Sequence, residues 1–335
     1  MSLDSVVRQW QSDGEVFPNF SVWNTIKPRP AQTVPLPADL HPRLKAALQV
    51  DGIRTLYAHQ AEAWNLVRSG KNLVLATGTA SGKTLAYNLP VLQTLLEDEQ
   101  ARALYLFPTK ALAQDQLSIL AKQLSAPGHG GEPASPQAAI YDGDTPAGQR
   151  AAIRHAARLV LSNPDMLHTG ILPHHTSWGD FFQRLRYVVI DEMHSYRGVF
   201  GSHVANVLRR LMRVARFHGS RPQFILSSAT IGNPAELAQR LIESPVELVD
   251  SDGSARGPRY FFLYNPPVID PALGLRKSSL LEGVRLSQDL LAGHVQTLVF
   301  ARSRRSVEQI LTYMQDAVPS RTQYATSARD AAVPV

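Results

Sequence analysis

Residues 72–84 read Asn-Leu-Val-Leu-Ala-Thr-Gly-Thr-Ala-Ser-Gly-Lys-Thr, and the helical pattern of residues 85–96 follows at once. A short apolar strand, a tight turn of small residues and a helix in this order predict a phosphate-binding loop, because the N–H groups of the turn and the positive end of the helix both face the phosphates. Thr77 stands where the general pattern favours Gly or Ala, and Ala80 stands where Gly is frequent. A chance Gly-Lys-Thr is the alternative, and the flanking strand and helix disfavour it.

Two side chains at the end of this loop are expected to carry its chemistry. Lys83 would reach the β- and γ-phosphates of a bound nucleotide, and the hydroxyl of Thr84 would join the ligand shell of a Mg²⁺ ion. The sequence therefore predicts a nucleotide cradle that consists of Thr79, Ala80, Ser81, Gly82, Lys83 and Thr84.

Apolar runs alternate with helix-like stretches from residue 72 onward. Each run is short and uniformly apolar, as strands buried on both faces of a parallel sheet are. This alternation predicts an α/β fold with right-handed βαβ units and a doubly wound, mostly parallel sheet. The predicted strands are residues 72–76, 103–107, 138–141, 158–161, 187–190, 223–226 and 246–249, and residues 204–214 are one of the predicted helices.

The region before this alternating part is rich in proline. Six prolines fall between Pro18 and Pro42, and because proline lacks a backbone donor and disrupts helix interiors, we expect residues 1–37 to form an irregular, extended arm. Its aromatic side chains Phe17, Phe20 and Trp23 are expected to pack against a core rather than to form a binding stripe. A helix over residues 38–50 follows. The Gly/Pro-rich residues 126–136 are predicted to be a surface loop.

A second domain is predicted to begin beyond the first, which spans residues 38–250. The composition changes at residues 250–258, which are predicted to be a linker. The rest of residues 251–335 would contain a strand at 260–264, a helix at 278–291, a strand at 297–301 and a helix at 306–318. No apolar period continues after residue 318. We therefore expect an incomplete second α/β domain, as in a truncated gene product, a frameshift or a recombinant fragment.

Composition limits the class of protein. Of the 335 residues 44% are hydrophobic and 19% charged, which provides a conventional core and argues against disorder. The absence of cysteine excludes disulfides, thiolate metal sites and a cysteine nucleophile, so no zinc is expected. A net charge of +6 suits a polyanionic partner without proving one. No membrane span or signal peptide is recognisable, and we expect a soluble, cytoplasmic protein.

A pair of carboxylates follows the predicted strand at residues 187–190. Asp191 and Glu192 stand at a strand's carboxyl end, where open α/β sheets bind ligands. Asp191 would hold Mg²⁺ through its water shell, and Glu192 would orient and deprotonate the attacking water. A solvated Asp-Glu pair that opens a helix is the alternative, which the phosphate loop makes less attractive. His194 has no second ligand at helical spacing, so a hydrogen-bonding relay is favoured over a zinc site.

The motifs of residues 57–230 together resemble those of the superfamily 2 DEAD/DEAH-box helicases, which are P-loop NTPases with RecA-like lobes. Each motif stands at a strand end and in family order, and the set is highly specific. The motifs are Gln60, Thr79-Ala80-Ser81-Gly82-Lys83-Thr84, Pro108-Thr109-Lys110-Ala111-Leu112, Ser162-Asn163-Pro164-Asp165, Asp191-Glu192-Met193-His194 and Ser228-Ala229-Thr230.

The resemblance implies a role for each motif. ATP and Mg²⁺ would be the cofactors, with Tyr57 and Gln60 in the motif that recognises adenine. The backbone of a single strand would be bound by Pro108, Thr109, Lys110, Asn163 and Asp165, while His194, Ser228 and Thr230 would couple hydrolysis to strand movement. Independently of the resemblance, Lys110 at a strand-to-helix turn suits a phosphate contact, and a solvent-facing lysine is the alternative.

Residues 77–84, 191–206 and 209–211 are similar to one branch of this family. These are the DNA-repair helicases that carry a C-terminal cysteine cluster and are related to the RecQ-four-like enzymes, described as ATP-dependent 3′→5′ helicases of strand junctions. A complete member continues to a full second lobe, a Gln-x-x-Gly-Arg-x-x-Arg motif and the cysteine cluster, which this sequence does not contain. Residues 296–304 look like the first strand of that lobe.

The resemblance therefore implies the first motor lobe of an ATP-dependent DNA helicase in DNA repair, with single-stranded or tailed DNA as its partner. An RNA helicase or a duplex translocase with the same core is an alternative. A non-catalytic nucleotide- or nucleic-acid-binding fragment is another, because the arginines needed for turnover would come from the second lobe.

Overall fold

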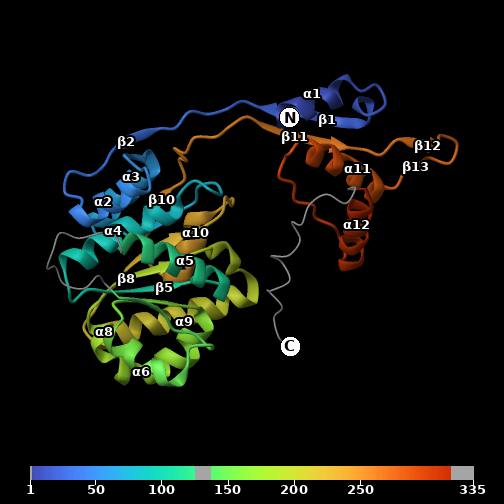
Figure 1. Cartoon of the computed structure of the whole chain (residues 1–335). Helices are drawn as coiled ribbons and strands as arrows, with labels where there is room; N and C mark the ends of the chain where they lie inside the picture. The colour runs from blue at the N-terminus through green and yellow to red at the C-terminus, as the bar shows by residue number, and fades with distance from the viewer. Residues whose placement is uncertain (1, 125–136, 318–335) are drawn as a thin grey trace. The chain divides into compact units, whose positions relative to one another are not determined.

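The computed structural model describes residues 2–124 and 137–317. The chain forms two compact units, which we call the main unit (Arg29–Arg256) and the minor unit (the first 28 residues together with those from Gly257 onward). Figure 1 shows the residues of both units, coloured by their position in the chain. The predicted surface loop at residues 126–136 and the chain beyond residue 317 lie outside the described residues.

The main unit contains a seven-stranded sheet in the order β10-β4-β9-β8-β5-β7-β6, and every neighbouring pair of strands is parallel. This confirms the predicted doubly wound α/β fold and all seven predicted strands, with small shifts at their ends. The strands are β4 (Leu73–Leu75), β5 (Arg102–Leu106), β6 (Ala138–Ile140), β7 (Leu159–Ser162), β8 (Leu185–Ile190), β9 (Gln223–Ser227) and β10 (Glu247–Val249).

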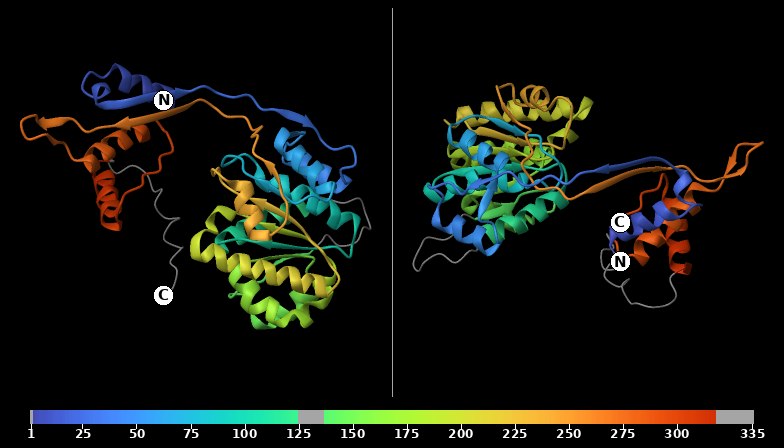
Figure 2. Two further views of the ribbon diagram at one scale, coloured as in Figure 1. Left: turned by 180° about the vertical axis from the view of Figure 1, so that it is seen from behind. Right: turned by 90° about the horizontal axis from the view of Figure 1, so that it is seen from above.

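Helices cover both faces of this sheet (Figure 2). One face packs against α2 (Pro42–Val50), α3 (Ala58–Arg68), α4 (Lys83–Glu97) and α5 (Lys110–Leu124). The other packs against α7 (Pro164–Met166), η2 (Leu167–Ile171), η3 (Leu172–Trp178), α8 (Gly179–Gln183), α9 (Gly198–Phe217) and α10 (Pro234–Ile242). The remaining elements of the unit are β2 (Thr33–Pro35), β3 (Thr55–Tyr57), α6 (Ala147–Ala156) and η4 (Met193–Ser195).

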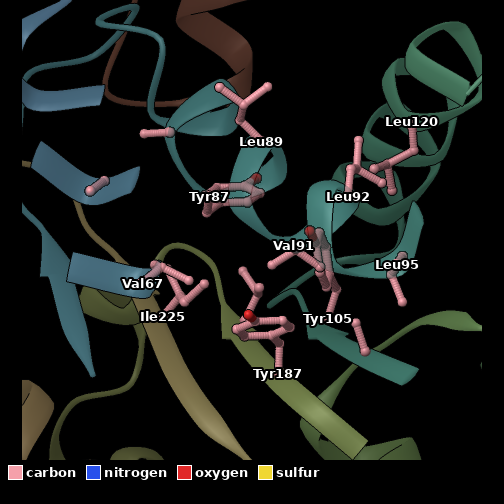
Figure 3. Packing of buried hydrophobic residues seen from close by; sticks show 14 of the residues in the cluster. Val67, Tyr87, Leu89, Val91, Leu92, Leu95, Tyr105, Leu120, Tyr187 and Ile225 are labelled. Carbon is pink, nitrogen blue, oxygen red and sulfur yellow. The ribbon is translucent and has the colours of Figure 1, made fainter. Parts of the chain in front are cut away.

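The apolar strands divide their side chains between two cores. Leu73 and Leu75 of β4 point into the core on the α4 side, while Val74 between them points into the core on the α9 side, because successive strand residues face opposite sides. Figure 3 shows Tyr87 of α4 packed among Ile225 and the other side chains of the first core. No described helix is long and apolar enough to span a membrane.

The predicted helix at residues 38–50 begins later than expected. It starts at Pro42, the first helical residue, where a missing N–H does no harm. Nδ1 of His41 accepts the next N–H, that of Arg43, at 3.2 Å. Pro42 therefore opens the helix rather than interrupting it.

The prediction of an irregular arm is wrong for much of residues 1–37. An α-helix, α1 (Leu3–Ser12), precedes the first proline, and β1 (Phe20–Ile26) pairs antiparallel with β11 (Arg259–Tyr264). The helix forms because Val6 and Trp10 lie on one face and are buried. Phe20 and Trp23 of β1 pack against Phe262, so the expectation that the aromatic side chains serve a core is confirmed for these two, whereas Phe17 is 38% exposed.

The rest of the minor unit consists of η1 (Phe17–Asn19), β12 (Val268–Asp270), β13 (Leu275–Arg276), α11 (Ser279–Ala292) and α12 (Arg304–Ala317). The predicted strand at 297–301 is wrong, because these residues have no regular secondary structure. Its side chains lack a covering layer in the described chain, and Leu298 and Phe300 are 79% and 86% exposed. An apolar run forms a strand only where a neighbouring strand pairs with it.

Candidate active site

Three of the predicted motifs lie at one edge of the sheet. The phosphate loop follows β4, Asp191 follows β8, and Ser228 follows β9, which lies between those two strands. The carboxyl ends of parallel strands share an edge, and ligands bind there in open α/β sheets. The fold therefore brings the three motifs together.

The phosphate loop is held by its own side chains. Nζ of Lys83 donates hydrogen bonds to the carbonyl oxygens of Thr77 and Gly78, at 3.0 and 2.9 Å. The hydroxyls of Thr77 and Ser81 are hydrogen-bonded at 2.7 Å and buried. Thr77, which departs from the general pattern, thus stabilises the turn from within. Ala80, at the other departure, adopts a left-handed conformation (φ +58°).

Gln60 joins the predicted adenine motif to this loop. Its Oε1 accepts the N–H of Tyr57 at 2.9 Å, and its Nε2 donates to the carbonyl of Gly82 at 3.0 Å. The side chain is buried. A carboxamide has two N–H groups and two oxygen lone pairs, so one of each remains for a purine edge.

Asp191 is buried and receives several hydrogen bonds. Its Oδ1 accepts the N–H of Glu192 at 3.0 Å and the hydroxyl of Ser227, and its Oδ2 accepts the hydroxyl of Tyr87 at 3.2 Å. Burial and this carboxylate raise the pKa of Tyr87 well above its ordinary value, so the phenol stays a donor. The position of Asp191 is therefore fixed from three sides.

The oxygen atoms around Asp191 suit Mg²⁺. A hydrogen bond from the Thr84 hydroxyl lowers the raised pKa of Tyr87 in part, so the Thr84 hydroxyl, the Tyr87 hydroxyl and the Asp191 carboxylate form one cluster. Hydroxyl and carboxylate oxygens are ligands that Mg²⁺ prefers. Among the described residues no group of three or more His, Cys, Asp or Glu side chains forms a metal site. Nucleotide phosphates and water would have to complete the shell.

Glu192 and His194 connect the carboxylate motif to the strand-end serine motif. Nδ1 of His194 accepts the backbone N–H of Ala229 at 3.1 Å, and it also lies 3.1 Å from Oε2 of Glu192. His194 therefore contacts both the carboxylate of Glu192 and the segment that follows β9. Glu192 adopts a left-handed backbone conformation, with a φ of +51°.

The serine that contacts Asp191 is Ser227, one residue before the predicted Ser228. The hydroxyl of Ser228 is buried without a hydrogen-bond partner, and Thr230 is exposed. Both predicted residues lie near the site but contact none of its carboxylates in this structure. The sequence run Ser-Ser could not show which hydroxyl faces the carboxylate, because alternate strand residues point to opposite faces.

The predicted nucleic-acid residues follow the neighbouring strands β5 and β7. Lys110, exposed, pairs with Asp144 at 2.6 Å, and this hydrogen bond raises the pKa of the lysine. Oγ1 of Thr109 accepts the N–H of Leu112 at 3.4 Å, and Pro108 precedes it. These side chains lie at the same edge as the phosphate loop but do not touch it.

After β7, Asn163 caps a helix. Its Oδ1 accepts the N–H of Met166 at 2.8 Å, which leaves the amide Nδ2 as a free donor. Asp165 is exposed in the first helical turn, where a carboxylate suits the helix dipole. As an anion it is a poor direct ligand for phosphate.

The end of the main unit also contacts the loop, which sequence analysis missed. The guanidinium of Arg256 lies against Gly78, and the N–H of Gly253 donates to Nδ1 of His59 at 3.2 Å. Burial opposes ionisation of Asp252, but hydrogen bonds from Ser254 and Arg256 outweigh it and hold the pKa of this carboxyl well below its ordinary value. Composition alone marked these residues as a linker.

Comparison with known proteins gives a consistent result. The profile of the DEAD/DEAH box helicase family matches residues 57–237. The uncharacterized ATP-dependent helicase YprA of Bacillus subtilis is 51% identical over 296 residues, which cover 88% of this chain and 39% of the relative. The ATP-dependent helicase HRQ1 of Saccharomyces cerevisiae is 37% identical, over 86% of this chain and 26% of the relative. The chain thus spans less than half the length of these relatives.

Solved structures show the same relationship. The DUF1998 helicase MrfA bound to DNA superposes with a TM-score of 0.89 and 49% identity, over 94% of this chain and 41% of that protein. The Mycobacterium smegmatis helicase Lhr bound to single-stranded DNA and AMP-PNP has a TM-score of 0.62 and 24% identity, over 83% of this chain and 36% of that one. The second likeness concerns the fold, which is that of a RecA-like helicase core.

Proposed function

The chain belongs to the DEAD/DEAH box helicase family, and we propose that it forms the nucleotide-binding lobe of an ATP-dependent DNA helicase. Residues 38–250 would be the ATP-binding domain and residues 251–335 the linker and the beginning of a second RecA-like domain. The observation that carries this proposal is the junction of the phosphate loop, Asp191 and Gln60 at one edge of the sheet. Relatives named as DNA-bound or DNA helicases favour DNA as the partner.

ATP would bind with its adenine at Tyr57 and Gln60. Residues 79–84 would surround the phosphates through backbone N–H groups, with Lys83 turning from the carbonyls of its own loop to the β- and γ-phosphates. Mg²⁺, bound at Thr84 and Asp191, would neutralise phosphate charge. Gln60 is hydrogen-bonded to Gly82 of this loop, and Thr84 and Asp191 belong to the oxygen cluster described above.

Hydrolysis would depend on Glu192. A carboxylate beside the phosphates can orient a water and accept its proton. His194, bonded to Ala229, would pass the state of this site to the segment that contains Ser228 and Thr230. Such a contact is a positioning role, because the imidazole reaches the strand end and not the nucleotide.

A single DNA strand would run along the neighbouring strand ends. Lys110, Thr109 and the free Nδ2 of Asn163 would contact phosphates, which carry no sequence information, while Pro108 and Asp165 shape the two turns. We further propose action in DNA repair and a cytoplasmic location. The repair role rests on the branch of the family that the motifs resemble, and the location rests on a sequence without a recognisable signal peptide or membrane span.

Calorimetric titration with Mg-ADP tests the nucleotide site. We expect Lys83→Ala to weaken binding roughly ten- to a hundred-fold, because a charge-assisted hydrogen bond contributes about 1.5–3 kcal/mol. The control is Lys122→Ala, which removes an exposed lysine from the last turn of α5 and should bind like wild type. Equal affinity in wild type and Lys83→Ala would remove the case for this loop.

Fluorescence anisotropy with labelled oligonucleotides tests the polymer. We expect salt-sensitive, sequence-independent binding to single-stranded DNA, because phosphate contacts release counterions. Matched RNA oligonucleotides distinguish the DNA helicase from an RNA helicase with the same core. Tighter binding of RNA, or an affinity that does not change with salt, would contradict the proposal.

A further inference from the structure

A groove of about 390 Å³ lies beside the predicted nucleic-acid residues, and apart from Pro164 and Asp165 its lining has no predicted role in nucleic-acid binding. Its lining comes from the turn after β7 and from one side of α9. The side chains that matter are Asp165, His168, Phe200, His203, Arg210 and Arg213. Pro164, the residue after Asn163, lines the groove, so the groove adjoins the proposed strand path.

The spacing of these residues places them on one face of α9. His203, Arg210 and Arg213 recur at intervals of seven and three, which is one side of a helix. Val204, Leu208 and Leu211 face the core instead. Because the helix rises 1.5 Å per residue, the face from Phe200 to Arg213 is about 20 Å long. It is long enough to accompany several nucleotides.

The cations of this face are available to a ligand. In the described chain neither Arg210 nor Arg213 has a carboxylate within 4.0 Å, although Asp165 lines the same groove. The contact of Arg210 with His168 is a long 3.5 Å. The adjacent Arg209, on another side of α9, is by contrast paired with Glu243 at 2.6 Å. Arg209, outside the groove, is thus neutralised by a carboxylate, whereas within the described chain Arg210 and Arg213 inside it are not.

An exposed aromatic ring completes the surface. Phe200 lines the groove and is 44% exposed, and its ring lies 5.8 Å from that of the buried Tyr196. A phenyl ring held in this way can stack a nucleobase, and stacking tolerates any sequence. Arginines without a carboxylate partner, next to one exposed aromatic ring, suit a ligand with both phosphate groups and nucleobases.

We propose that this groove binds the single strand beyond Asn163, with Arg210 and Arg213 on its phosphates and a base stacked on Phe200. The inference rests on the proposed function, because it assigns a second contact surface to the same strand.

The test measures binding of a labelled single-stranded oligonucleotide over a salt series. For single strands the slope of log affinity against log salt falls by about 0.7 for each phosphate contact. We expect the double variant Arg210→Ala/Arg213→Ala to bind at least ten-fold more weakly at low salt, with a slope smaller by about 1.4. The matched control Arg216→Ala, exposed in the last turn of α9 outside the groove, should keep both values.

Phe200→Ala separates stacking from charge. Loss of one stacked base should weaken binding roughly ten-fold and leave the salt slope unchanged. Retained Mg-ADP binding shows that each variant is folded. If wild type binds no single strand, the proposed function fails. If wild type binds and both groove variants keep its affinity and slope, the groove serves another macromolecule and this inference is overturned.

Discussion

Gly82 is required for two reasons, namely its left-handed backbone conformation and the closeness of the Gln60 side chain. Its φ of +82° lies in the left-handed region, and a Cβ there would lie 2.5 Å from Nε2 of Gln60. Left-handed backbone costs other residues about 1–2 kcal/mol. We therefore expect Gly82→Ala to displace the loop or Gln60 and to weaken Mg-ADP binding at least ten-fold, as measured by calorimetric titration.

The matched control is Gly143→Ala, since nothing lies within 4 Å of a Cβ at that position and its φ is not positive. Its affinity should equal that of wild type. Unchanged affinity in Gly82→Ala would mean that the loop binds nucleotide in another conformation.

His59 should make stability depend on pH. Burial lowers its pKa below the ordinary value of 6.5, and Asp252 opposes this only in part. The unfolded chain therefore takes up the proton first, so stability falls as pH drops through and below about 6.5. We expect His59→Gln to lose less stability than wild type between pH 8 and pH 5.5, measured by urea unfolding at both values.

Replacement of the exposed His155 by Gln is the control for that experiment and should keep the pH dependence of wild type. An equal loss of stability in His59→Gln and wild type would show that other groups cause it.

For single residues, prediction from sequence succeeded where the proposed chemistry requires one particular type of side chain. Lys83, Asp191 and Gln60 follow from spacing and motif order, and the structure places them together. Tyr87 and Arg256 could not be found in this way. Their contacts with Asp191 and Gly78 depend on how α4 and the end of the main unit fold back, which no local pattern encodes.

Strand β7 illustrates how single elements contribute to stability. Val160 is fully buried in it, whereas Val50 at the end of α2 is 79% exposed. We expect Val160→Ala to lower the free energy of unfolding by roughly 2 kcal/mol, from lost transfer energy and a cavity. Val50→Ala, the matched control, should change it by less than about 0.5 kcal/mol. Urea unfolding measures both, and equal effects would contradict the assigned core.

Prediction succeeded for elements whose pattern matches their surroundings. The five inner strands of the main sheet (β4, β5, β7, β8 and β9) are buried on both faces over most of their length, so an apolar run suffices to identify them. The run at 297–301 has the same pattern but lacks partner strands in the described chain. The helix α1 was missed because the prolines that follow it were taken to characterise the whole region, although Val6 and Trp10 already share one face.

For the molecule as a whole we expect slow ATP hydrolysis and no unwinding by this 335-residue chain alone. An arginine opposite the phosphate loop contributes roughly 10³- to 10⁵-fold in related phosphoryl transfers. The family resemblance puts that arginine in a motif that is not found in this sequence. Steady-state ATPase assays with and without single-stranded DNA, and strand separation of a tailed duplex, measure the two activities.

Glu192→Gln is the control that assigns any observed turnover to this site. Robust DNA-stimulated hydrolysis that disappears in Glu192→Gln would mean that the catalytic cation comes from elsewhere. The expectation would then be withdrawn.

Arg29 and Arg256 meet in a β-bridge with backbone hydrogen bonds of 2.9 Å in both directions, so the chain enters and leaves the main unit at one place. The paired strands β1 and β11 join residues 242 positions apart, as in the bond between Ser21 and Leu263. Closing so long a loop costs conformational entropy. Once the main unit has folded and Arg29 is paired with Arg256, only a few residues separate this bridge from the first pair of β1 and β11, Ile26 and Arg259. The main unit should therefore fold before the minor unit. During synthesis, β1 remains unpaired until the ribosome has made β11.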